Sequence, residues 1–289
     1  MTTVITIASG KGGAGKSSLS VNFALRLQAI AGNTLLVDYD LLAANTHILL
    51  GLKPKVDLIS FLDGECKITD AIHKTTDALS ILPGRTGASV ELEKNGDPLK
   101  NLIPHIRDNV DGMNFAVIDA PAGASRAVLN SMANSDHVVI VLLKQATSFV
   151  DAYSLIKNAY FEHRITQFNV VVNLAESKSQ ARLIFDFFAR TASNLLPVSV
   201  IYAGHVEQRD AIANSDIRCQ PIVQFPEEKC QIAAFDTILK KILASPRNDA
   251  KLKRDASFGV MAPAGQMVCM PGLPFFVLMI PVGSAMNMP

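Results

Sequence analysis

The sequence predicts an α/β fold with a doubly wound, mostly parallel sheet and helices on both of its faces. Short segments rich in Val and Ile recur along the chain, and stretches with helical periodicity separate them. Several of the short segments are apolar at nearly every position, which is typical of strands whose two faces are both covered by helices. Regular alternation of the two element types favours a single α/β domain.

The apolar segments are the expected strands, and the periodic stretches are the expected helices. The first helix is expected over 17–31, where Leu19 and Phe23 recur at helical spacing. Gly32 then supplies a residue that readily ends a helix. The expected strands are 4–8, 35–38, 79–82, 115–119, 138–143, 170–174 and 198–202. The further expected helices are 125–134, 149–163, 180–194 and 229–243.

One domain is expected over residues 1–244, followed over 245–289 by a basic linker and an uncharged tail rich in Met and Pro. The length of 289 residues supplies ample material for one large core. A helix that spans a membrane needs about 20 uninterrupted apolar residues. Pro263, Pro271 and Pro281 interrupt the tail, so we expect neither a spanning helix nor a standard amphipathic membrane-targeting helix.

Charge and cysteine usage exclude several classes of protein. The chain has 27 Lys and Arg against 26 Asp and Glu, so it lacks the overall positive field of a dedicated nucleic-acid binder. The four cysteines form no Cys-x-x-Cys pair, which disfavours a disulfide framework or a zinc site and fits a cytoplasmic protein. No secretory signal is expected, because no basic segment leads into an apolar one.

The strongest motif lies between the first strand and the first helix. Its glycines let successive backbone N–H groups point at phosphate oxygens, and the following helix contributes its positive N-terminus. The Lys-Ser pair that ends it matches a P-loop, whereas a glycine-rich turn that merely joins strand to helix would not need it. The expected fold is therefore a P-loop NTPase. The expected phosphate-binding residues are Gly10, Lys11, Gly12, Gly13, Ala14, Gly15, Lys16, Ser17 and Ser18.

Polar residues at three further strand ends complete the predicted site. Asp38 and Asp40 stand at the end of the second strand, and Asp119 ends the strand 115–119. Ligands of open α/β sheets bind beyond the carboxyl ends of the strands. Each acid alone is more simply a turn residue, but together with the P-loop they indicate a nucleotide site. Asn173 ends another strand, and the donor and acceptor of its amide suit the edge of a purine. That Asn173 is an ordinary turn residue is an equally good interpretation.

The P-loop has a second lysine, Lys11, directly after its first glycine, and so resembles the deviant Walker A box of the MinD/ParA ATPases. The resemblance covers nearly all of residues 3–244. It implies a slow, partner-stimulated ATPase that uses ATP and Mg²⁺ and alternates between a monomer and a homodimer with ATP sandwiched in it. Peripheral contact with the inner face of the cell membrane also stays open.

The resemblance assigns a role to each site residue. Lys11, Lys16 and Asp40 would be catalytic, with Lys11 reaching the phosphates of the other subunit and Asp40 orienting the attacking water. Ser17, Asp40 and Asp119 would hold Mg²⁺. In this family an asparagine at the position of Asn173 reads adenine. Asp38 would support the site, and the N–H of Gly123 would sense the γ-phosphate.

Within this family, residues 38–54 and 147–157 look like the flagellar-number regulators known as FlhG or FleN. That branch implies control of the placement or number of a cell-surface machine, the flagellum, through a partner GTPase or a transcription activator. His47 departs from the pattern, since relatives usually carry Asp two residues after the switch asparagine, which is Asn45 here. The alternatives are a ParA-type DNA-partition ATPase, with DNA the less favoured partner, and a non-hydrolysing scaffold. A NAD-binding Rossmann domain is disfavoured, because such a loop needs no Lys-Ser pair.

Overall fold

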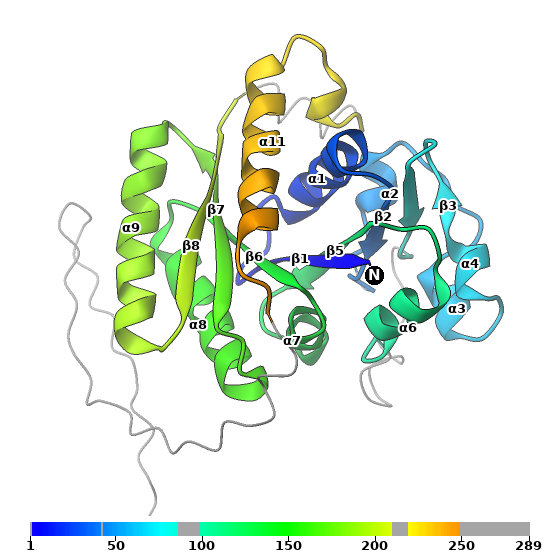
Figure 1. Cartoon of the computed structure of the whole chain (residues 1–289), viewed down its shortest axis with the longest axis horizontal. Coiled ribbons are helices and arrows are strands. Elements are labelled where there is room, and N and C mark those ends of the chain that lie inside the picture. Colours follow the sequence, from blue (N-terminus) through cyan, green and yellow to red (C-terminus); the bar gives the residue numbers. More distant parts are fainter. Residues whose placement is uncertain (1, 42, 86–98, 210–218, 249–289) are drawn as a thin grey trace, which may run out of the picture. The chain divides into compact units, whose positions relative to one another are not determined.

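The computed structural model describes residues 2–41, 43–85, 99–209 and 219–248 (Figure 1). Its described strands form one sheet in the order β3-β4-β2-β5-β1-β6-β7-β8. The neighbouring strands run parallel, apart from the antiparallel pair of β3 and β4. The predicted doubly wound, mostly parallel sheet is confirmed. The strands are β1 (Thr3–Ser9), β2 (Thr34–Asp38), β3 (His73–Lys74), β4 (Leu79–Leu82), β5 (Phe115–Ala122), β6 (His137–Leu142), β7 (Gln167–Ala175) and β8 (Ser199–Glu207).

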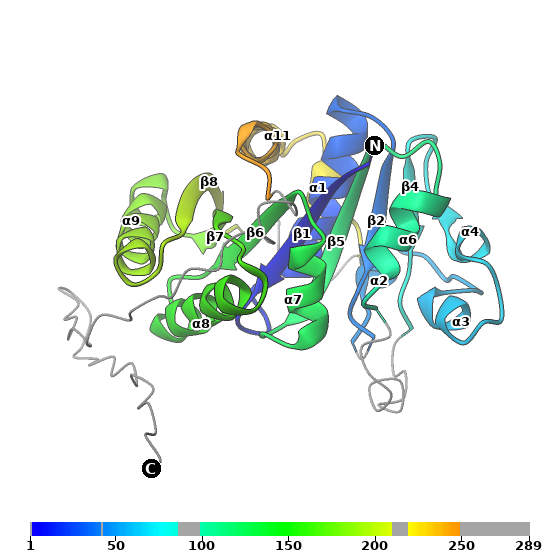
Figure 2. The ribbon, with the colours of Figure 1, turned by 60° about the horizontal axis from the view of Figure 1, so that its bottom comes forward.

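Helices cover both faces of this sheet, with α1 and α11 on one face and α7 and α8 on the other (Figure 2). The long helices are α1 (Lys16–Ile30), α8 (Ala146–His163), α9 (Lys178–Leu195) and α11 (Lys229–Ala244). The shorter ones are α2 (Thr46–Leu49), α3 (Leu58–Leu62), α4 (Ile68–Ala71), α6 (Leu102–Asn109), α7 (Arg126–Ala133) and the 3₁₀ turn η1 (Ile222–Gln224).

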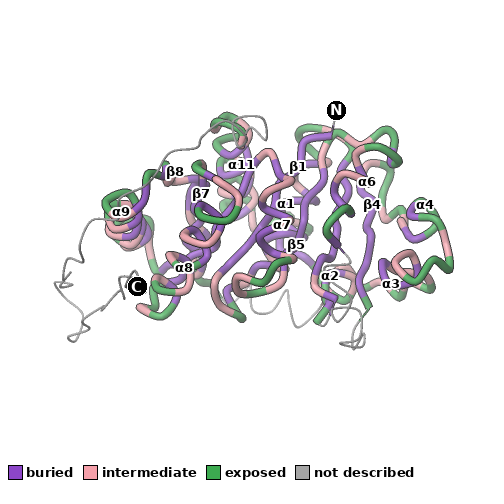
Figure 3. Tube along the Cα trace, turned by 90° about the horizontal axis from the view of Figure 1, so that it is seen from below, coloured by how far each residue is buried: buried purple, intermediate pink, exposed green. Residues whose placement is uncertain are grey.

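Successive strand residues face opposite sides of the sheet, and both sides are apolar. In β6, Val139 and Val141 pack with the residues of α1 and α11, whereas Val138 and Ile140 pack with those of α7, α8 and α9. The central strands are accordingly buried along their length (Figure 3). This two-sided burial is why the strands read as uniformly apolar in the sequence.

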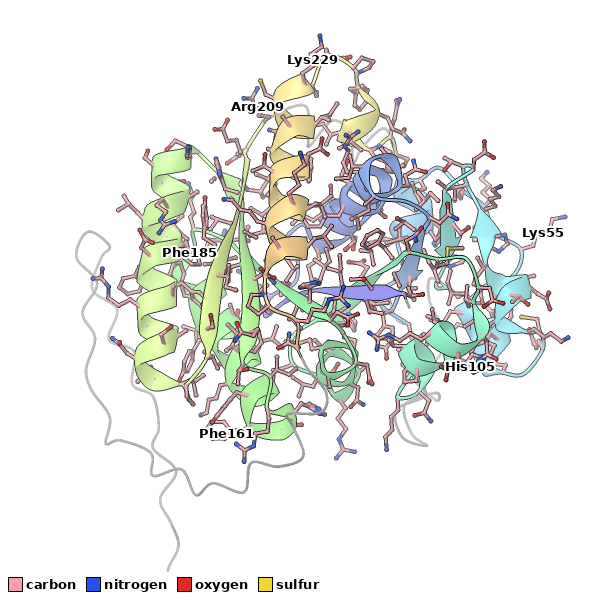
Figure 4. All side chains as sticks on the ribbon, in the orientation of Figure 1. Lys55, His105, Phe161, Phe185, Arg209 and Lys229 are labelled. Atoms are coloured by element: carbon pink, nitrogen blue, oxygen red, sulfur yellow. The ribbon has the colours of Figure 1, made fainter. Side chains whose placement is uncertain are left out.

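Strand β8 forms one edge of the sheet, where aromatic and cationic side chains gather. Phe185 of α9, labelled in Figure 4, lies 4.9 Å from the Tyr202 ring, measured between ring centroids. Arg182 of α9 and Lys241 of α11 place their charges 5.2 and 5.5 Å from the centre of the same ring. A cation over an aromatic ring is attracted to the face of the ring, so these contacts help to join α9 and α11 to β8.

The chain divides into two compact units, Met1–Lys253 and Arg254–Pro289. The second unit lies outside the described residues, and so do the features predicted for the tail over 256–289. The domain boundary predicted after residue 244 stays a prediction. Among the described residues, none of the helices combines the length and apolar character needed to cross a bilayer.

Candidate nucleotide-binding site

The predicted P-loop forms a tight turn between the carboxyl end of β1 and the first residue of α1. Gly13 and Gly15 have φ angles of +74° and +79°, a left-handed conformation that side chains with a Cβ rarely adopt. Gly15 is the N-cap of α1, so the positive end of the helix opens directly onto this turn. At the other end of the loop, a Cβ on Gly10 would lie 2.2 Å from the backbone of Asp151, so glycine is needed there for packing.

The two loop lysines have different surroundings. Lys16 is buried, and burial lowers its pKa although the charges of Asp119 and Asp40 act to raise it. Lys11 instead reaches the start of α8, where its Nζ donates to Gln145 Oε1 at 3.2 Å and to Thr147 Oγ1 at 3.3 Å. Both of these acceptors are uncharged.

Two carboxylates lie side by side at the ends of β2 and β5. Asp38 and Asp119 are directly paired in the register of these strands, and both side chains are buried. Burial and the charge of Asp38 raise the pKa of Asp119 to about 7, although hydrogen bonds from Ser17 and Ser20 lower it. The Ser20 hydroxyl donates to Asp119 Oδ1 at 2.8 Å. The pair therefore concentrates negative charge next to the P-loop.

Asp38 fixes the chain segment that leads into α2. Its Oδ2 accepts hydrogen bonds from the backbone N–H groups of Asn45 and Thr46, both at 3.0 Å. The Thr46 hydroxyl donates to the same oxygen at 2.8 Å. Burial raises the pKa of Asp38, and these hydrogen bonds act in the opposite direction. The carboxylate of Asp38 therefore holds the backbone of Asn45 and Thr46 in place, which fits the supporting role expected for it.

Asp40 and Gly123 follow the carboxyl ends of two paired strands, β2 and β5. Asp40 is partly exposed, and its Oδ1 accepts a hydrogen bond from the Ala43 N–H at 2.9 Å. The Gly123 N–H donates to the carbonyl of Ser9 at 3.0 Å. In this structure the N–H expected to sense a phosphate is thus engaged with the end of β1.

Asn173 lies under the P-loop at the carboxyl end of β7. Its Nδ2 donates to the carbonyl of Ala14 at 2.9 Å. A Cβ on Gly15 would lie only 2.4 Å from this nitrogen, so the amide fills the space next to the glycine. The sequence singles out Asn173 for a contact with adenine, and the structure adds a contact with the loop itself.

His47, which replaces the acid expected in switch I, lies in α2. Its Nδ1 is buried and has no hydrogen-bond partner among the described residues. A histidine there cannot accept hydrogen bonds as a carboxylate does.

The surroundings of Asp119 fit a bound Mg²⁺ ion. Mg²⁺ prefers oxygen ligands, and Ser17 and Asp119 supply a hydroxyl and a carboxylate that interact with each other. Burial and the neighbouring charge of Asp38 make the ionised form of Asp119 unfavourable, and its pKa is raised accordingly. A divalent cation between these carboxylates would offset their negative charge.

Three residues that contact this site are not predicted from the sequence. Ser20 lies one turn after Ser17 on α1, and its position as a polar residue on the sheet-facing side of the helix is a usable signal. Gln145 and Thr147 carry no comparable signal, because only the tertiary fold brings them to Lys11.

A family model described as an AAA domain matches residues 2–170, which is more than half of the chain. Antiactivator FleN of Pseudomonas aeruginosa is 30% identical over 244 residues, which cover 84% of this chain and 87% of FleN. The chain belongs to the MinD/ParA family of P-loop ATPases. Within this family it resembles the FlhG/FleN branch, as the sequence predicts.

Two further comparisons agree with this assignment to the MinD/ParA ATPases. The flagellum site-determining protein YlxH of Helicobacter pylori is 26% identical, with 71% of this chain and 70% of YlxH covered. The septum site-determining protein MinD of Pyrococcus horikoshii, solved in complex with Mg-ADP, superposes with a TM-score of 0.68 at 24% identity. That match covers 85% of this chain and 98% of the MinD chain, and it confirms the MinD-like fold.

Proposed function

We propose that this ATPase switches between a monomer and an ATP-bound homodimer, and that the switch controls the placement or number of flagella. The observation that carries the proposal is the likeness to antiactivator FleN along 84% of the chain. The likeness to YlxH, which is named for determining the flagellum site, supports the same process. A protein partner such as a flagellar GTPase or a transcription activator would read the dimer.

The P-loop binds the phosphates of ATP. Backbone N–H groups of the loop and the N-terminus of α1 attract the phosphate oxygens. A triphosphate also supplies the negative charge that the buried Lys16 ammonium needs, so binding offsets the burial that lowers the pKa of this lysine. Lys16 is therefore the proposed contact to the β- and γ-phosphates.

Ser17, Asp40 and Asp119 are the proposed Mg²⁺ ligands, and Asp40 is also the proposed residue that orients the attacking water. Bound Mg²⁺ supplies charge neutralisation for transfer of the γ-phosphoryl group. Asp40 is partly exposed just beyond the carboxyl end of β2, and one of its carboxylate oxygens accepts a hydrogen bond from the Ala43 N–H. A carboxylate oriented in this way can accept a hydrogen bond from a water molecule and direct it at the phosphorus.

Lys11 is the proposed contribution of each subunit to the site of its partner. Its hydrogen bonds with Gln145 and Thr147 are both to neutral acceptors, and within the described part of the chain the Lys11 ammonium has no ion pair. A phosphate group of a second subunit would provide a charged acceptor, so the attraction between opposite charges would add to the hydrogen bond. Dimer formation with ATP is therefore favoured over the monomer contact.

Size-exclusion chromatography with light scattering tests the dimer. The wild-type chain should have the mass of a monomer with ADP and of a dimer with ATP, and Lys11→Ala should remain monomeric with both. Lys55→Ala is the matched control, because it removes an exposed lysine outside the P-loop (Figure 4). This variant should dimerise like the wild type. A mass that does not respond to the nucleotide would contradict the switch.

Phosphate release tests the role of Asp40. Asp40→Ala should still bind ATP, because the P-loop and Lys16 keep the phosphate contacts, but it should hydrolyse ATP at least about 100-fold more slowly, because it removes the group that orients the water. Asp77→Ala removes a fully exposed carboxylate and should leave the rate unchanged. Equal rates for Asp40→Ala and the wild type would show that another group orients the water.

Counts of flagella per cell test the biological output. The host is a flagellated bacterium from which its own FleN relative has been deleted, and electron microscopy gives the counts. The wild-type chain should restore the parental number, and Lys16→Ala should not. Unchanged counts with the wild-type chain would contradict the flagellar role and leave the ATPase assignment standing.

A further inference from the structure

The Asn173 side chain has a contact that its expected use as an adenine reader does not explain. Asn173 is only 5% exposed, and its Nδ2 donates to the Ala14 carbonyl at 2.9 Å. Because the partner is a carbonyl oxygen, the nitrogen of the amide must face the loop and the oxygen must face away from it. One of the two amide hydrogens is therefore committed to the P-loop.

This contact acts on the turn that immediately precedes Lys16. The Ala14 carbonyl and the Gly15 N–H belong to the same planar trans peptide, so they point in opposite directions. Holding the carbonyl against β7 therefore fixes the direction of the Gly15 N–H, one of the groups expected to face a phosphate. Gly15 is left-handed with a φ of +79°, and Asn173 fills the space that a Cβ would occupy there.

We infer that Asn173 is a positioning residue for the phosphate site. It orients the Ala14–Gly15 peptide of the loop through the Ala14 carbonyl, so its effect on binding is independent of the base. This inference concerns the ATP site alone, and the proposed flagellar role can fail without affecting it.

A ligand without a base separates positioning of the loop from reading of adenine. Inorganic tripolyphosphate with Mg²⁺ carries the phosphate chain of ATP but no purine. A residue that orients the loop must affect tripolyphosphate and ATP alike. A residue that only reads adenine must affect ATP and leave tripolyphosphate and GTP unchanged.

Isothermal titration calorimetry with Mg²⁺ plus ATP, GTP or tripolyphosphate provides the test on the full chain. Asn173→Ala removes the donor, and Asn173→Asp keeps the shape but places an acceptor against the Ala14 carbonyl. Asn169→Ala is the matched control, since Asn169 is equally buried on the same strand but donates to Ser245, away from the loop. A thermal melt of each variant reports whether it is folded.

Asn173→Ala should weaken the binding of all three ligands by a similar factor of about tenfold, the size expected for one lost hydrogen bond. Asn173→Asp should weaken it further, because a carboxylate repels both the carbonyl and the phosphates. Asn169→Ala should leave all three affinities unchanged. The inference is overturned if Asn173→Ala weakens ATP alone, or if it changes none of the affinities.

Discussion

At the scale of single residues, the paired carboxylates of Asp38 and Asp119 dominate the electrostatics of the site. Two acids that are both buried and adjacent cannot both ionise without a cost. This cost appears at Asp119, because burial and the charge of the neighbouring Asp38 raise the pKa of this residue to about 7. The nucleotide-free protein therefore carries an electrostatic strain that depends on pH, and bound Mg²⁺ would relieve it.

Asp119→Asn is expected to stabilise the nucleotide-free protein at pH 8, by on the order of 2 kcal/mol, and to lose this effect gradually as the pH falls from about 7 toward about 4. Between the ordinary pKa of an aspartate and about 7, the folded state binds a proton that the unfolded state has released. The stability contributed by this group therefore falls as the pH rises through that window. Urea denaturation at several pH values gives the free energies of unfolding.

Asp57→Asn is the control of opposite sign. Burial raises the pKa of Asp57, but hydrogen bonds from Arg85 and Ser60 outweigh burial and lower it overall. Its replacement should therefore destabilise the protein at pH 8, with an effect that fades as the pH falls toward the pKa of the folded state. Parallel pH profiles for the two variants would contradict the origin given for the Asp119 shift.

The sequence predicts site residues only where a local pattern encodes them. The P-loop glycines and Lys16 follow a fixed spacing, and the acids stand at recognisable strand ends, so the tight turn and the carboxylate pair could be expected. The contact of Asn173 with Ala14 could not, because it joins residues 159 positions apart and depends on how β7 lies under the loop.

At the scale of elements, a partly buried ion pair and two aromatic rings join α1 to α11. Arg26 Nε and Nη2 donate to the two carboxylate oxygens of Asp236 at 2.7 and 2.9 Å. Phe23 and Phe235 meet edge to face, with their ring centroids 5.7 Å apart. The helix that begins at the P-loop is thereby fixed to the last described helix.

Asp236→Asn should lower the free energy of unfolding by about 1 kcal/mol, because it weakens a bidentate pair whose side chains are only 20% and 23% exposed. Asp186→Asn is the matched control. Its partner Arg182 lies one helical turn away, and these side chains are 57% and 42% exposed, so a loss below about 0.5 kcal/mol is expected. Urea denaturation of both variants measures the difference, and equal losses would show that partial burial adds nothing to the α1–α11 pair.

The long helices and the apolar strands could be predicted from the sequence, whereas several of the shortest elements could not. Helix α1 is expected over 17–31 and spans Lys16–Ile30, because apolar residues recur at helical spacing over about three turns of it. Helices α3 and α4 have only 5 and 4 residues, too few to show a period. Strand β3 has two residues and is defined by its pairing with β4 alone.

At the scale of the whole described molecule, the chain beyond α11 returns to the amino ends of β6 and β7. We call residues 245–248 the C-terminal clasp. Ser245 Oγ accepts from Asn169 Nδ2 at 3.0 Å and hydrogen-bonds with His137 Nδ1 at 3.2 Å. Asn248 bonds through its side chain to both backbone groups of Gln167 and through its N–H to the Asp136 carbonyl. The clasp is polar and too short for a periodic pattern, so it could not be predicted from the sequence.

Two truncations should separate the contribution of the clasp from that of the residues after it. A chain that ends after residue 253 retains every described contact and is the reference. A chain that ends after Ala244 should unfold several degrees lower, a loss of about 1–3 kcal/mol, since the buried side chains of Asn169 and His137 would lose their partner Ser245. Asn248→Ala in the full chain should fall between the two, because it removes two of the hydrogen bonds and keeps those of Ser245. Scanning calorimetry provides the comparison, and equal melting temperatures for the two truncated chains would show that the clasp contributes nothing to stability.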